Sequence, residues 1–223
     1  TFLVLDAEGR LLHKVIGSYS VDEIIERIEE SFDEEKAYGS LKAKYESGNR
    51  EQVFMVKYLK MLIRYYDPAM EAAELINTLS DKEKVEEAYW FVFSNPKLTP
   101  EGSANEAWLL KNHKRFNKTV GKEKVEQELD KRYTEKLLKV LSQKEKIWTE
   151  KQLAALGREI AALKLNTNEE LQAYVTVAKT ALKKGVEELI SVCETEFPKF
   201  RTKEIPYIQF CDRIVAEASP ADR

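Results

Sequence analysis

The first 17 residues, TFLVLDAEGRLLHKVIG (Thr1–Gly17), carry a strand pattern that does not recur in the rest of the 223-residue chain. The continuous apolar run from Phe2 to Leu5 predicts a strand covered on both faces, and the apolar residues after the turn predict its partner. Asp6 and Gly9 lie between the two, where Asp bonds to nearby backbone and Gly takes the positive φ of a bulged hairpin. An isolated hairpin is marginally stable in water, so this one needs a further strand or helix to cover it.

After Gly17 the spacing of apolar residues changes from two to 3.6, which predicts a helix over 21–32. Ser20 immediately precedes this helix, and Glu23 lies three positions after Ser20, which is the spacing of a capping box. The same spacing predicts further helix starts at Ser80 and Glu83, Ser103 and Glu106, Thr149 and Gln152, and Thr167 and Glu170. Apolar stripes follow these starts, the longest of them being Val125, Leu129, Tyr133, Leu137 and Leu141.

The C-terminal part shows two more helix signals. Gly185 is predicted to be the C′ residue in a short turn between two helices. A last helix is predicted with Pro206 in its first turn. Its apolar stripe consists of Ile205, Ile208, Cys211, Ile214 and Val215.

The chain is therefore predicted to be mainly α, with an N-terminal β-hairpin plus helix followed by a multi-helix bundle of α-hairpins that resembles a solenoid. Eight Gly and six Pro, beside abundant Glu, Lys, Leu and Ala, favour helices. The loop SNPKLTPEGS, residues 94–103, is a candidate seam between two helical halves.

Charge and composition exclude several classes of protein. Lys and Arg number 36 against 39 Asp and Glu, and because the signs are mixed along the chain, we expect no nucleic-acid surface. No apolar run approaches the roughly 20 residues of a membrane span. Cys193 and Cys211 lack C-x-x-C or zinc spacing and are predicted to be buried structural thiols or, alternatively, a disulfide between adjacent helices.

Candidate sites are few. His13 is expected to be half-buried or at a strand edge, and His113 to lie on a solvated helix face. No Cys or carboxylate cluster at ligand spacing surrounds either histidine, so no metal site is expected. Nucleotide-binding and hydrolase motifs are absent from the sequence, so neither a cofactor site nor a catalytic residue is predicted.

An aromatic cluster is the best candidate for a partner groove, because aromatic anchors carry interface energy. It consists of Tyr58, Tyr65, Tyr66, Tyr89, Trp90, Phe91, Phe93 and Trp108. The predicted groove residues are Tyr89, Trp90 and Trp108, with Lys111 and Arg115 from the basic run KNHKRFNK at its rim. The alternative is that the aromatic rings form core and that the basic run is a solvated helix end near the C-terminal dipole.

The order of strand, D-x-x-G turn, strand, Gly17 and amphipathic helix over residues 1–34 resembles the last third of a thioredoxin fold. Residues 35–223 resemble the helical extension of some thioredoxin-like proteins of Bacteroidetes-type bacteria, through segments such as YESGNREQVFMVKYLKMLIRYYD and LTPEGSANEAWLLKNHKRF. The resemblance implies two domains, a thioredoxin-like remnant at 1–34 and a helical domain at 35–223. It also implies that the catalytic C-x-x-C and the cis-proline lie upstream of Thr1, outside this chain.

The function expected from this resemblance is a non-catalytic helical protein-interaction module of a thioredoxin-like protein. The alternative is one part of a thiol-disulfide oxidoreductase whose active-site cysteines lie upstream of Thr1. A protein or peptide is the expected partner, and the open edge of the hairpin allows a homodimer or docking within the chain. The resemblance implies a periplasmic location and a role in cell redox homeostasis, with a cytoplasmic location as the alternative.

Overall fold

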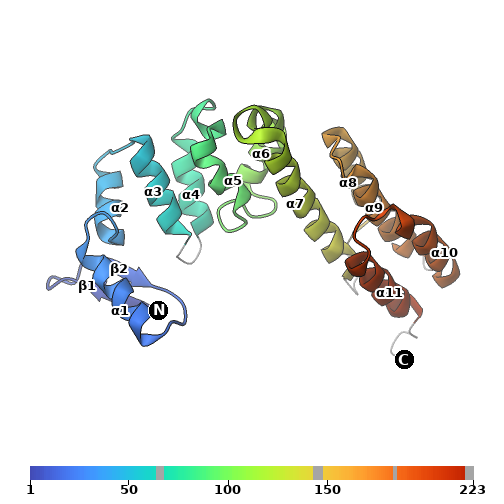
Figure 1. Ribbon diagram of the computed structural model, residues 1–223, viewed down its shortest axis with the longest axis horizontal. Coiled ribbons are helices and arrows are strands. Elements are labelled where there is room, and N and C mark those ends of the chain that lie inside the picture. The colour runs from blue at the N-terminus through green and yellow to red at the C-terminus, as the bar shows by residue number, and fades with distance from the viewer. Residues whose placement is uncertain (64–67, 143–147, 183–184, 219–223) are drawn as a thin grey trace. The chain divides into compact units, whose positions relative to one another are not determined.

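The computed structural model describes residues 1–63, 68–142, 148–182 and 185–218 (Figure 1). It is 72% helical with one two-stranded hairpin at the N-terminus, which confirms the mainly α class. The chain divides into two compact units, Thr1–Lys122 and Glu123–Arg223. The boundary between the two units lies between Lys122 and Glu123. The loop 94–103, the candidate seam, lies inside the first unit.

The hairpin has the predicted form. Strands β1 (Phe2–Leu5) and β2 (Leu11–Val15) are antiparallel, with an irregular register between Val4 and Leu5. Gly9 has a φ of +80° in the turn. Asp6 Oδ1 accepts hydrogen bonds from two backbone N–H groups, at 3.0 and 2.8 Å, so the side chain fixes the turn as the sequence indicates.

The first unit continues with six helices and several single turns. They are α1 (Val21–Glu29), a 3-10 turn (Glu30–Phe32), α2 (Tyr38–Glu46), α3 (Gln52–Leu62), α4 (Pro68–Asn77), 3-10 turns (Glu83–Val85 and Glu87–Tyr89), α5 (Trp90–Ser94) and α6 (Ala104–Phe116). A π-helical turn (Asn117–Gly121) follows α6. The inner faces of these helices form the core, whose largest fully buried side chains include Tyr58, Tyr89, Phe93 and Phe116.

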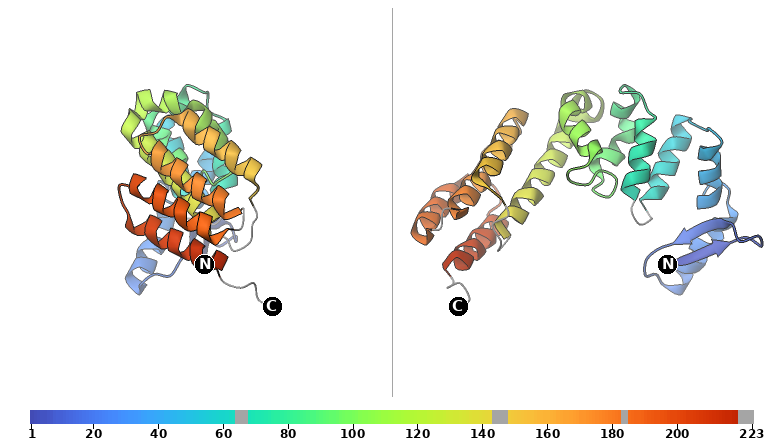
Figure 2. Two further views of the ribbon diagram at one scale, coloured as in Figure 1. Left: turned by 90° about the vertical axis from the view of Figure 1, so that its right-hand side faces the viewer. Right: turned by 180° about the vertical axis from the view of Figure 1, so that it is seen from behind.

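In the second unit, the last four described helices pack on their neighbours in sequence (Figure 2). The elements of this unit are α7 (Lys122–Ser142), α8 (Glu150–Leu163), α9 (Asn168–Leu182), α10 (Val186–Glu196), a 3-10 turn (Phe197–Lys199) and α11 (Glu204–Ala218). All five members of the stripe predicted on α7 are buried, so that prediction is confirmed. The predicted helical hairpin is present as α9 and α10.

The predicted capping boxes have different outcomes. Complete boxes form at Ser20 and at Thr149, and Ser80 exchanges the same two bonds with Glu83 ahead of a 3-10 turn. At Ser103 the hydroxyl accepts the N–H of residue 106, but the carboxylate of that residue binds the backbone of Gly102. The box predicted at Thr167 is wrong, because its hydroxyl has no hydrogen-bond partner among the described residues and the Glu170 carboxylate pairs with Arg201 instead.

Two predictions near the C-terminus are corrected. Gly185 has an extended backbone with φ of −145° and is the N-cap of α10, so it does not act as a left-handed C′ residue. The stripe predicted on α11 is largely exposed; the buried residues of this helix are Pro206, Phe210 and Arg213. Phe210 packs in the ring cluster of Tyr174 and Phe200, and this contact rotates the apolar stripe away from the core.

Candidate functional site

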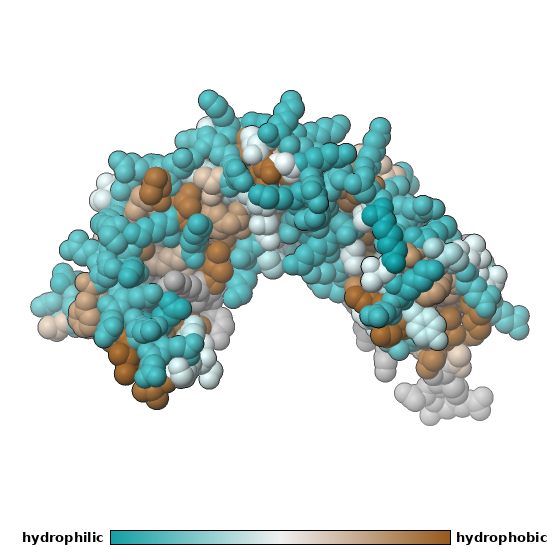
Figure 3. Space-filling view, in the orientation of Figure 1, coloured by the Kyte–Doolittle hydropathy of each residue, from teal (hydrophilic) through white to brown (hydrophobic). Residues whose placement is uncertain are grey.

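The N-terminal hairpin, α1 and the 3-10 turn after α1 carry exposed apolar side chains, which together are called here the hairpin surface. It consists of Phe2, Leu3, Leu5, Val21, Ile25, Ile28 and Phe32. Phe2, Leu3 and Leu5 are 51, 58 and 50% exposed although they lie on both faces of β1, and α1 has no buried residue. Brown side chains gather over this part of the chain in Figure 3. The strand expected to be covered on both faces is therefore uncovered by the residues that the structure describes.

The two strands of the hairpin differ in their surroundings. Helix α2 packs tightly against β2, and a Cβ atom added to Gly39 would lie 2.3 Å from the carbonyl oxygen of Leu11. Within the described ranges, β1 pairs with β2 alone, so its other edge carries backbone groups without a strand partner. An edge of this kind is a template for a further strand.

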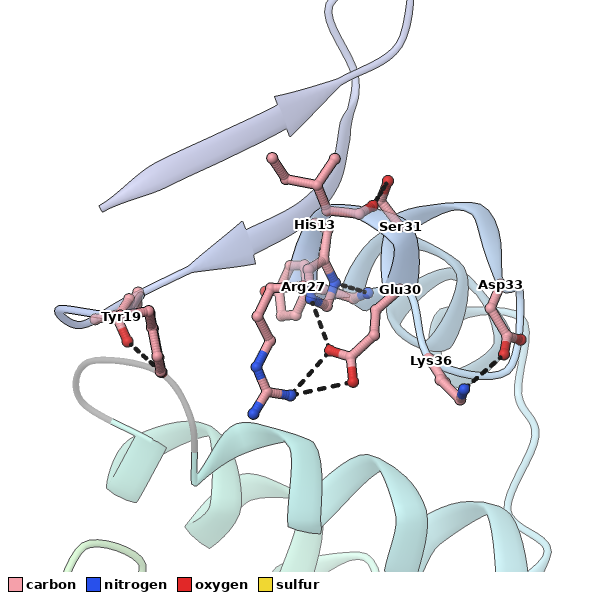
Figure 4. Close-up of polar contacts among 10 residues, drawn as sticks. His13, Tyr19, Arg27, Glu30, Ser31, Asp33 and Lys36 are labelled. Atoms are coloured by element: carbon pink, nitrogen blue, oxygen red, sulfur yellow. Dashed lines mark hydrogen bonds and ion pairs between the residues drawn. The ribbon is translucent and has the colours of Figure 1, made fainter. Parts of the chain in front are cut away.

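His13 lies on the inner face of β2, in contact with two helical segments (Figure 4). The side chain is 1% exposed, and its Nδ1 accepts a hydrogen bond from the N–H of Tyr38 at 3.1 Å. Its Nε2 lies 3.6 Å from Glu30 Oε2, and Arg27 Nη1 contacts both oxygens of that carboxylate at 3.1 Å. The prediction of a half-buried or edge histidine was therefore wrong. The signal that could have found its burial is its alternation with Val15 on one face of β2.

A cavity of about 260 Å³ opens beside this cluster. Its lining consists of Glu30, Glu35, Lys36, Leu41, Lys57, Lys60 and Met61. Glu35 is held by the ammonium groups of Lys44 and Lys57, which lower the pKa of its carboxyl from 4.5 to about 2. The lining therefore combines an apolar floor with charges that are largely paired inside the protein. No pattern in the sequence predicts this cavity, because its lining residues come from three separate segments.

The predicted groove residues all lie around α5 and α6. Tyr89 is buried, and desolvation raises the pKa of its hydroxyl. Trp90 and Trp108 are half-buried, with ring centroids 5.2 and 5.6 Å from that of Phe116. Residues Tyr65 and Tyr66 lie outside the described residues. The structure thus brings Trp90 and Trp108 together around Phe116 and leaves both partly exposed, whereas Tyr89 lies in the core.

The two cations predicted at the rim have different environments. Lys111 is exposed on α6. Arg115 donates from Nη2 to the carbonyl oxygen of Asp81 at 2.7 Å and from Nη1 to Asn112 at 3.3 Å. Arg115 therefore connects the end of α6 to the loop before the 3-10 turn Glu83–Val85. The partner groove itself stays a prediction.

Both cysteines are free thiols on adjacent helices, Cys193 on α10 and Cys211 on α11. Cys193 is buried as predicted, whereas Cys211 is only half-buried, so its predicted burial is wrong. Burial raises the pKa of the Cys193 thiol to about 11. Since the thiolate is the reactive form, a thiol with this pKa is a poor nucleophile at neutral pH.

This environment predicts a slow reaction of Cys193 with Ellman's reagent. At pH 8 we expect the thiol to react about two-hundredfold more slowly than a free cysteine of ordinary pKa near 8.5, because only roughly one thiol in a thousand is ionised against about one in four. The measurement is the labelling rate of the Cys211→Ser variant, in native buffer and in denaturant. Fast labelling of this variant in native buffer would contradict the burial of Cys193.

In the described ranges, no group of three or more His, Cys, Asp or Glu side chains is placed to hold a metal ion, and no helix there is long and apolar enough to cross a membrane. No family model, curated protein or solved structure matches the chain.

Proposed function

We propose that this chain is a non-catalytic helical interaction module of a thioredoxin-like protein, and that its hairpin surface docks on the remaining sheet of the thioredoxin-like domain. The observation that carries the proposal is the exposure of apolar side chains on both faces of β1 and along α1. Exposed apolar patches of this kind mark interaction sites in soluble proteins.

The energetics favour a covering element. Complete burial of one large apolar side chain is worth about 1.5–3 kcal/mol, and the hairpin surface contains seven such side chains. An added strand on β1 would also provide partners for the backbone groups at its open edge. The packing of α2 on β2 directs this growth to the β1 side of the sheet.

Thiol chemistry within this chain has little support. Cys193 is buried with a raised pKa, and it lies on α10, far in sequence from the hairpin. In the alternative proposal, a thiol-disulfide oxidoreductase, the attacking cysteine belongs to a C-x-x-C upstream of Thr1. The helical units would then hold a client or partner near that site, in the periplasm as the family resemblance suggests.

Site-specific photo-crosslinking in the producing cell tests the docking surface. Benzoyl-phenylalanine at Leu3 or Ile25 is expected to crosslink to residues outside 1–223, identified by mass spectrometry, because both positions lie on the hairpin surface. Lys97 is the matched control, since it is exposed in the loop before α6. Crosslinks that stay within residues 1–223 at both test positions would overturn the proposal.

The coding sequence upstream of Thr1 separates the two versions. A proline directly before Thr1 together with a C-x-x-C favours the oxidoreductase. The proline alone favours the non-catalytic module. If both the proline and the C-x-x-C are absent, the thioredoxin resemblance is wrong. Insulin reduction by the complete protein, compared with its C-x-x-C double mutant, then measures whether thiol exchange occurs.

A further inference from the structure

The contact between His13 and α2 joins the hairpin to the helical part of the first unit. The N–H of Tyr38, the first residue of α2, is one of the helix N-terminal donors that have no partner within the helix. The N-cap Ala37 has no side-chain acceptor, and His13 Nδ1 takes that place from another element of the fold. We propose that His13 is a pH-sensitive latch, in which the neutral imidazole holds the start of α2 against β2 and protonation on Nδ1 releases it.

The hydrogen bonds define one tautomer. Nδ1 accepts from a backbone N–H, so in a neutral ring the proton is on Nε2. Nε2 faces Glu30 Oε2 at 3.6 Å, consistent with a donor on that side. The neutral ring therefore satisfies the helix end only while Nδ1 carries no proton.

The charged groups around His13 come from the helical segments packed on β2 and from β2 itself. Segment 30–32 contributes Glu30 and α1 contributes Arg27, which are paired with each other. On α2, the Tyr38 ring lies 4.6 Å from the ammonium of Lys14 and 5.9 Å from that of Lys42. In the turn before α2, Asp33 pairs with Lys36, and β1 contributes no titratable side chain.

Protonation of the latched ring is opposed by these surroundings. A proton on Nδ1 would face the Tyr38 N–H, so two donors would meet and both would lose their acceptor. A cation there would also lie at the positive end of the α2 dipole. Glu30 offers a compensating charge beside Nε2, which it shares with Arg27, but it supplies no acceptor at Nδ1, where the Tyr38 N–H lies.

Release of α2 exposes the imidazole to water, where such a ring titrates near pH 6.5. The latch is therefore fully stable above about pH 6.5 and weakens as the pH falls, because only the open form takes up the proton readily. Between pH 7.5 and pH 5.5 the open population is expected to rise about tenfold. Any effect of this change on partner docking rests on the proposed function, whereas the latch itself involves only this chain.

Amide hydrogen exchange by NMR tests the latch in the complete chain. After correction for intrinsic rates, the protection factor of the Tyr38 amide is expected to fall about tenfold from pH 7.5 to pH 5.5. The Met55 amide, which bonds to the carbonyl of Glu51 in α3 at 2.9 Å, is the internal control and is expected to stay unchanged. Equal Tyr38 protection at both pH values would overturn the proposal.

Two substitutions and one spectrum make the test specific. His13→Asn places an amide oxygen near the position of Nδ1 without a titrating ring, so it is expected to keep Tyr38 protected at both pH values. His13→Leu removes the acceptor and is expected to lower protection at both. The imidazole ¹⁵N shifts of the wild type should show the Nε2–H tautomer at pH 7.5. An Nδ1–H tautomer, or a tenfold fall that persists in His13→Asn, would contradict the latch, and neither result depends on partner binding.

Discussion

Replacing Phe116 by Ala is expected to destabilise the first unit by about 3–5 kcal/mol, the usual cost of removing a buried aromatic ring from a core. Phe116 is fully buried at the end of α6, and its ring centroid lies within 5.0–5.6 Å of three aromatic rings: Trp90, Phe93 and Trp108. The substitution removes the ring that all three share and leaves a cavity between α5 and α6. Urea unfolding followed by circular dichroism gives the change in the free energy of unfolding.

Phe32→Ala is the matched control for this experiment. Phe32 is 78% exposed in the isolated chain, so its removal is expected to change stability by at most about 0.5 kcal/mol. Tryptophan fluorescence supplies a local readout, because loss of the Phe116 ring exposes Trp90 and Trp108 and shifts emission to longer wavelength. Equal losses for the two variants would contradict the placement of Phe116 in the core.

This result also bears on the predicted partner groove. Trp90 and Trp108 are held in place by Phe116, so their exposed edges form a fixed surface only while that ring is present. Tyr89 is buried, so an effect of its substitution on binding would arise through the core. Alanine substitutions at the two Trp residues are therefore the informative ones for binding by this group.

Local signals in the sequence predicted local structure well. The turn at Asp6, the complete capping boxes and the stripe on α7 depend on residues within four positions of one another, and all are present. The mainly α class follows from these elements. No feature of the described structure tests the thioredoxin resemblance, which stays a prediction.

Tertiary contacts decided the features that the sequence did not predict. The Glu170 carboxylate pairs with Arg201, 31 positions later in the chain, and does not complete the cap at Thr167. Phe210 turns α11 toward Tyr174, which exposes the predicted stripe. His13 is buried because the start of α2 returns to β2 after 25 residues. Such pairings between distant segments have no spacing rule in a single sequence.

Gly39→Ala is expected to separate α2 from β2 and to destabilise the first unit by about 2 kcal/mol. The added Cβ would lie 2.3 Å from the carbonyl oxygen of Leu11, a contact that only a backbone shift can relieve. Overpacking of this kind costs roughly 3 kcal/mol, and the better helix propensity of Ala offsets up to about 1 kcal/mol of it. The clash outweighs the propensity because the obstructing atom belongs to a strand backbone. Urea unfolding measures the loss, and reduced protection of the Tyr38 amide reports the separation.

Gly157→Ala on α8 is the control, since it makes the same change in helix propensity with a softer neighbourhood. There the added Cβ would lie 3.3 Å from side-chain atoms of Gln172 and Val175, which adjust by small rotations. We therefore expect a change within about 1 kcal/mol of zero. If Gly39→Ala were as mild as this control, α2 would not be packed on the backbone of β2. The sheet would then be open on both sides, and the argument that a partner strand adds at β1 would lose its direction.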